Sequence, residues 1–185
     1  MRLATVDDVP MGWVSLVSTV VGAVVALSGS LLANRITARD QLTRDRESFR
    51  RVVYVDYATA LDAAHVALRA VASDVDPDRD QYAQATAAVG QSGLYRTREH
   101  LLMFGTSPVA AAAENAFQAL IEIRQAVRSG AELKSAEYHA AYHDFADQIW
   151  TFRMAVREDL GEPAFSPALM GHVDWSEREE CPVCG

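Results

Sequence analysis

The sequence predicts an all-α protein: an N-terminal transmembrane helix that continues into a cytoplasmic antiparallel bundle of about four helices, followed by an extended tail. Three observations support this prediction. Residues 9–34 contain no charged side chain, apolar residues further along recur at steps of three and four, and no segment alternates apolar and polar residues as a half-buried strand would. The predicted parts are an N-terminal tail (1–8), a transmembrane helix (9–34), an Arg-rich juxtamembrane helix (35–51), a helical bundle (52–161) and a tail (162–185).

The uncharged run at residues 9–34 is long enough to cross a bilayer. About 26 residues at 1.5 Å per residue extend roughly 39 Å, against a hydrocarbon core of about 30 Å. Trp13 lies near one end, where interfacial aromatic residues are enriched. A cleaved signal peptide and a buried helix of a soluble domain are the alternatives. The length of the run and the acidic residues before it favour a permanent anchor.

Charges differ sharply between the two sides of this run. Asp7 and Asp8 precede it, whereas six arginines follow, diluted by three acidic residues. These arginines are Arg35, Arg39, Arg44, Arg46, Arg50 and Arg51. The positive-inside rule then places the N-terminus outside and most of the chain in the cytoplasm, at the inner (plasma) membrane of the cell. The arginines form a basic collar that either faces anionic lipid or serves orientation alone.

Small residues recur every four positions within the predicted anchor, at Ser18, Gly22, Ala26 and Ser30. Such a stripe lets two membrane helices approach closely. It therefore predicts a helix-packing face and a homodimer, although small residues also coincide by chance in an Ala-rich chain.

Four helical stretches are expected after the anchor. No Gly or Pro occurs between Ser30 and Asp76, which predicts one continuous first helix with an apolar face. The second begins near Asp78 or Asp80 and runs towards Phe104, with Gly90–Gly93 predicting a kink or a short break. Six residues mark the other ends: Ser107 and Pro108 begin the third helix, which stops at Ser129–Gly130, and Ser135 and Gly161 bound the fourth.

The tail contains the sequence Cys181-Pro-Val-Cys184-Gly, which resembles the knuckle of zinc ribbons and rubredoxin-like sites. Its tight turn aims two thiolates at one metal ion, and a structural zinc requires four ligands. The missing ligands are sought at His172, at Asp174 or in the knuckle of a second chain. A redox pair and an inert pair of thiols are the alternatives. Zinc is the cofactor that this motif indicates.

Two other histidine patterns carry less weight. His139, His143 and Asp147 form one row on the last helix and could bind a divalent metal. Counted at 100° per residue, this row points away from the apolar face, so it is expected to be a solvated surface. Asp62-x-x-His65 matches only one part of the carboxylate–histidine set that a di-iron bundle needs.

The function predicted from these observations is a non-enzymatic scaffold, adaptor or regulatory subunit at the membrane. The net charge of −8 argues against nucleic-acid binding, and no phosphate loop, nucleophile elbow or HExxH motif is present in the sequence. One alternative is a metal- or redox-responsive module that uses the cysteine pair. The other is an enzyme with a site between helices, marked by a cavity lined by His65, Tyr57 or Tyr142 with converging polar groups.

Overall fold

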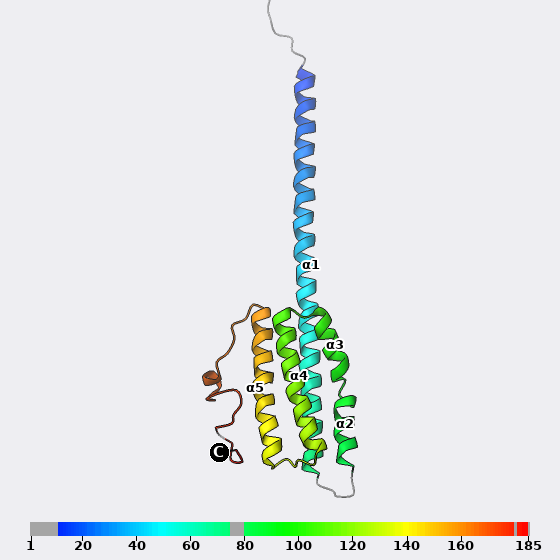
Figure 1. The fold of residues 1–185 in the computed structure, drawn as a ribbon. Coiled ribbons are helices and arrows are strands. Elements are labelled where there is room, and N and C mark those ends of the chain that lie inside the picture. The colour runs from blue at the N-terminus through cyan, green and yellow to red at the C-terminus, as the bar shows by residue number, and fades with distance from the viewer. Residues whose placement is uncertain (1–10, 75–79, 180, 185) are drawn as a thin grey trace, which may run out of the picture. The chain divides into compact units, whose positions relative to one another are not determined.

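The computed structural model describes residues 11–74, 80–179 and 181–184, with side chains described from residue 35 onward except residue 36. This part of the chain is all-helical, as predicted, and contains no strand (Figure 1). Its elements are α1 (Met11–Ser73), α2 (Gln81–Gln91), α3 (Leu94–Phe104), α4 (Ser107–Arg128), α5 (Ala136–Asp159) and a short 3-10 helix, η1 (Pro167–Met170). The chain divides into two compact units, Met1–Arg46 and Glu47–Gly185.

The first unit contains the beginning of α1. Arg35 and residues 37–46 are exposed, and the Thr43 hydroxyl donates a hydrogen bond to the Arg39 carbonyl at 3.0 Å. Within the part of the chain that was described, no helix has a stretch long and apolar enough to cross a membrane. The predicted span at 9–34 lies outside the residues with described side chains. So do the four small residues of its predicted packing face, Ser18, Gly22, Ala26 and Ser30.

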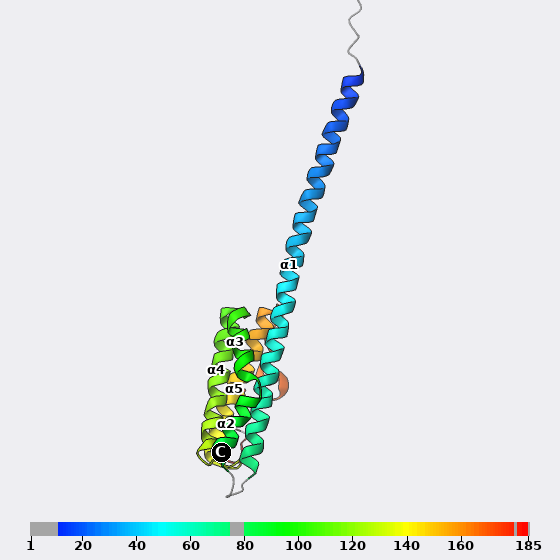
Figure 2. The ribbon, with the colours of Figure 1, turned by 90° about the vertical axis from the view of Figure 1, so that its right-hand side faces the viewer.

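The second unit is an antiparallel bundle of four helical segments. In chain order these segments are the part of α1 that follows Arg46, then α2 with α3, then α4, and finally α5. Each segment runs in the opposite direction to the one before it (Figures 1 and 2). The second predicted helix is therefore two helices in the structure. The break, predicted between Gly90 and Gly93, occurs at Gly93, the residue that caps the start of α3. Gly93 adopts a left-handed φ of 76°, which a residue with a side chain would disfavour.

The core of the bundle follows the predicted apolar spacing. In α4 six buried residues follow one another at steps of three and four: Val109, Ala113, Ala116, Leu120, Ile123 and Val127. Tyr57 of α1 lies at the centre, fully buried, with its ring edge-on to Phe152 of α5 at 5.2 Å. Its hydroxyl donates to the Ala113 carbonyl at 2.7 Å, so this buried polar group is satisfied within the core.

The helix ends match the predicted caps closely. The Ser135 hydroxyl accepts a hydrogen bond from the Tyr138 amide at 3.2 Å, which starts α5 as expected. Gly161, with φ 79°, follows the end of α5. At α4 the N-cap is Thr106 rather than Ser107, one residue earlier than predicted.

One carboxylate joins three parts of the bundle where α5 ends. Asp159 accepts hydrogen bonds from the Tyr54 hydroxyl of α1 at 2.9 Å and from the Thr106 hydroxyl before α4 at 2.7 Å. The Arg50 guanidinium lies 3.4 Å from the same carboxylate. Burial raises the pKa of Tyr54, and the hydrogen bond to Asp159 raises it further, so the hydroxyl stays protonated and able to donate.

The tail folds back along α5 in the opposite direction, and Figure 1 shows it running beside that helix. Near the end of α5, the Arg157 guanidinium lies 3.8 Å from the centre of the Phe165 ring and donates to the Pro163 carbonyl at 2.8 Å. Closer to the start of α5, Trp175 stacks on Trp150 with ring centres 4.4 Å apart. Phe165 and Trp175 of the tail therefore lie on the bundle, whereas Leu169 is 68% exposed.

Candidate metal centre

Four ligand atoms, two from α5 and two from the tail, converge near the start of α5. They belong to His139, His143, Cys181 and Cys184, and all lie within 4.8 Å of one another. The two histidines are one helical turn apart on α5, so they share a face. The two cysteines flank a turn in the tail at residues 182–184. The set is Cys₂His₂, a donor combination typical of structural zinc.

His143 is oriented as a metal ligand would be. Its side chain is only 2% exposed, and its Nδ1 lies 2.6 Å from the Ser176 carbonyl, to which it must donate because a carbonyl oxygen can only accept. Nε2 then carries the free lone pair. This atom is buried and has no hydrogen-bond partner among the described residues. A metal ion would satisfy it, and the Ser176 carbonyl would hold the ring in the correct tautomer.

The cysteine thiols lie against these rings. Cys181 Sγ is 3.2 Å from His139 Nδ1, and Cys181 is buried. Burial raises the pKa of Cys181, but hydrogen bonds to its sulfur, first among them the one from the Val183 amide, outweigh burial and bring the pKa to about 6. The pKa of Cys184 is raised by burial and by the adjacent Cys181 sulfur. Cys181 is therefore already poised as a thiolate, the form that binds metal.

Zinc bound by four such groups would sit in a nearly regular tetrahedron. With Zn–S of about 2.3 Å and Zn–N of about 2.0–2.1 Å, its ligand atoms are about 3.3–3.8 Å apart. The His139–Cys181 separation is already close to this range, and the widest pair has to close by about 1 Å. Four protein ligands leave no open position for substrate or water, so the arrangement suits a structural centre rather than a catalytic one.

The tail positions the knuckle through a few specific contacts. Asp174 accepts hydrogen bonds from the Ser176 hydroxyl at 2.7 Å and from the Glu177 amide at 2.9 Å. The Ser176 hydroxyl bond is the main cause of its lowered pKa. This turn places the Ser176 carbonyl against His143, and Arg178 then pairs with Asp144 of α5 at 2.9 Å. Of the described tail residues only Cys181 is buried, and the aromatic residues Phe165 and Trp175 are half-buried against α5.

The other predicted site residues lie elsewhere. His172 is outside the converging group, with its Nε2 3.9 Å from the Glu177 carboxylate, and Asp174 is occupied by the turn. Five of the six collar arginines are exposed: Arg35, Arg39, Arg44, Arg46 and Arg51. Arg50 differs, because it is half-buried against Asp159.

The expectation that the His139–His143–Asp147 row faces solvent is wrong for His143. The helical geometry behind it was correct, because the row does point away from the bundle core. The tail, however, covers this side of α5 and buries His143. The signal that would have found the site was available in the sequence: H-x₃-H and C-x₂-C together supply the four ligands that each lacks alone.

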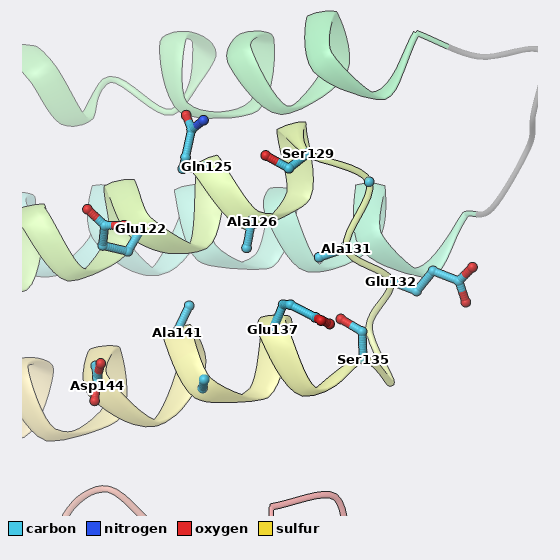
Figure 3. Close-up of a pocket in the computed structure, with 12 residues that line it drawn as sticks. Glu122, Gln125, Ala126, Ser129, Ala131, Glu132, Ser135, Glu137, Ala141 and Asp144 are labelled. Atoms are coloured by element: carbon cyan, nitrogen blue, oxygen red, sulfur yellow. The ribbon is translucent and has the colours of Figure 1, made fainter.

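A wider hollow lies on another side of α5. It measures about 790 Å³ and is bounded by α4, α5 and the loop between them, as Figure 3 shows. Four of its lining residues are acidic: Glu122, Glu132, Glu137 and Asp144. Its negative charge would repel anionic ligands.

No known protein family, no curated protein and no solved structure matches this chain. The functional inference therefore rests on the residues of the chain itself.

Proposed function

We propose that this protein is a membrane-anchored, non-enzymatic scaffold or regulatory subunit whose tail is fastened to α5 by one zinc ion. The observation that carries the proposal is the convergence of His139, His143, Cys181 and Cys184 within 4.8 Å. Two observations support it: the buried His143 Nε2 has no hydrogen-bond partner among the described residues, and Cys181 Sγ lies 3.2 Å from His139 Nδ1.

In this proposal zinc decides whether one face of α5 is covered. The tail lies over His139, His143 and Trp150 through ring stacking and hydrogen bonds, and only Cys181 among its described residues is buried. Loss of the metal removes the strongest link and opens this face to a protein partner. The module would then respond to zinc without catalysing a reaction.

The anchor in this proposal is the uncharged run at residues 9–34, with the arginine-rich stretch at 35–51 on its cytoplasmic side. The small residues at every fourth position, from Ser18 to Ser30, would let two anchors pack against each other. The bundle and its metal centre would then lie at the cytoplasmic face.

Zinc content tests the metal centre. We expect the full chain, purified in detergent, to contain about one zinc ion per chain, because the four ligands come from one copy. His143→Ala and Cys181→Ser should each reduce this content severely. His172→Ala should keep it, because His172 lies outside the group.

The same measurement separates the alternatives. One zinc per two chains, independent of His139 and His143, would indicate a centre built from two cysteine knuckles in a dimer and would contradict the proposed set. Wild-type protein free of zinc after growth and purification with zinc would overturn the metal centre altogether.

Accessibility to a membrane-impermeant thiol reagent tests the anchor. In a background with Cys181→Ser and Cys184→Ser, we expect Thr5→Cys to react in intact cells and Ser129→Cys to react only after lysis. The protein should also pellet with membranes and resist carbonate extraction. Recovery in the soluble fraction, or labelling of Ser129→Cys in intact cells, would contradict the proposed topology.

A further inference from the structure

A second cavity lies beside the metal centre, between α1 and the beginning of α5. It has a volume of about 290 Å³ and borders a neighbouring hollow of about 310 Å³. Both are close to the lower limit of small-molecule sites, which is about 300 Å³. The cavity is lined chiefly by polar and aromatic side chains: His65, Arg69, Lys134, Tyr138, His139 and Tyr142.

Two polar atoms of this lining are buried without a hydrogen-bond partner among the described residues. They are the hydroxyl of Tyr138, whose side chain is 3% exposed, and Nε2 of His65. Leaving such a group unsatisfied costs about 1–3 kcal/mol. The central tyrosine Tyr57, by contrast, is bonded to a carbonyl within the core. The two free atoms therefore mark this cavity as a place where a ligand, rather than the protein, would supply the partner.

The charges around the cavity favour a negatively charged ligand. Arg69 of α1 and Lys134 of the loop before α5 both line it, and within the described part of the chain neither makes an ion pair. Two acidic groups, Asp62 and Glu177, line the neighbouring hollow, which Arg69 borders as well. A guanidinium presents a planar fork of donors that fits carboxylate or phosphate oxygens. The cavity is thus a cationic pocket in a chain whose net charge is −8.

The aromatic groups are in the protonation states that such a ligand needs. The Tyr138 hydroxyl is a donor at neutral pH, because a tyrosine ordinarily loses its proton only near about pH 10. Burial also lowers the pKa of His65, outweighing Asp62, so its ring is neutral and carries one N–H. Tyr142 stacks on His65 at 5.6 Å between ring centres and holds the imidazole in place.

We infer that this cavity binds a small oxyanion, a carboxylate or a phosphate, through the Tyr138 hydroxyl and the charges of Arg69 and Lys134. This site is separate from the zinc ligand set, although the His139 side chain borders both. It gives the chain a ligand-binding activity beyond that of a scaffold. From the sequence, a cavity lined by His65, Tyr57 or Tyr142 with converging polar groups is the mark of a site between helices. This cavity is lined by two of those residues, His65 and Tyr142.

Calorimetric titration of the zinc-loaded full chain in detergent tests this inference. The probes are inorganic phosphate and acetate, with sodium chloride at matched ionic strength. We expect at least one oxyanion to bind, and its identity to distinguish a phosphate site from a carboxylate site. Tyr138→Phe and Arg69→Gln should each weaken binding roughly tenfold or more, because each removes a charged or charge-assisted hydrogen bond.

Matched variants separate binding from folding. Tyr82→Phe and Arg96→Gln change the same residue types at exposed positions of α2 and α3 and should bind as wild type does. Tyr138→Phe should be at least as stable as wild type, since it deletes a buried hydroxyl that has no partner in the described structure. Zinc content should stay unchanged in Tyr138→Phe and Arg69→Gln, so that this test and the zinc test fail independently.

Three results would overturn the inference. Neither phosphate nor acetate binds, chloride binds as tightly as they do, or the two control variants lose binding as much as the cavity variants. Stabilisation of Tyr138→Phe together with no binding by wild type would identify the cavity as a packing defect.

Discussion

Removing zinc from the full chain should release the tail while the bundle stays folded. Holding each tail residue in one conformation costs roughly 1–2 kcal/mol, and only Cys181 among the described tail residues is buried, so few packing contacts offset that cost. We expect a strong zinc chelator to make residues 162–185 much more sensitive to proteases, with little change in far-UV circular dichroism. Tryptophan fluorescence should change as well, because Trp175 leaves Trp150. Adding zinc back should reverse both effects.

Variants locate this effect at the metal centre. His139→Ala should resemble the chelated protein without any chelator, whereas His172→Ala should respond as wild type does. Trp175→Phe should lose the fluorescence change but keep the change in proteolysis. If wild-type protein shows the same tail proteolysis and fluorescence with and without chelator, contacts such as the Trp150–Trp175 stack are sufficient to hold the tail.

Replacing Asp159 should cause a large loss of stability. The side chain joins α1, the segment before α4 and α5 through Tyr54, Thr106 and Arg50. Asp159→Ala leaves these donors without their acceptor in a partly buried place. We expect the free energy of unfolding to fall by about 2–4 kcal/mol, measured by urea denaturation of the full chain in detergent.

The neighbouring Glu158 provides the matched control. It is an exposed acidic residue on the same helical turn, so Glu158→Ala should change stability by less than about 0.5 kcal/mol. Tyr54→Phe should cost about 1 kcal/mol alone and less in the Asp159→Ala background, because its partner is already gone. Equal effects of Asp159→Ala and Glu158→Ala would show that the hydrogen-bond hub contributes little.

Local rules predicted the bundle well, because its helices depend on interactions between near neighbours. The inward face of α4, the serine cap at Ser135 and the glycine after α5 all follow from spacing and from capping chemistry. The glycines at 90–93 predicted a break but not whether it was a kink or two helices. That outcome depends on how α2 and α3 pack on α4, which no local pattern specifies.

The sequence predicted only the cysteine half of the candidate metal centre, and the reason is physical. A knuckle shows its own turn in the sequence, but its partners depend on where the tail lies. His143 belongs to a face that points away from the core, and helical periodicity cannot report that a later segment covers it. Long-range pairs such as Trp150–Trp175 and Arg178–Asp144 set that path.

The reversed path of the tail has a consequence for how the molecule is assembled during synthesis. His139 and His143 emerge from the ribosome with α5, whereas Cys181 and Cys184 emerge well after that helix has ended. The bundle can therefore acquire its native packing before the centre has four ligands. Metal capture would be the last event of maturation, and a chain whose translation stops at the end of α5 would fold but could never be locked.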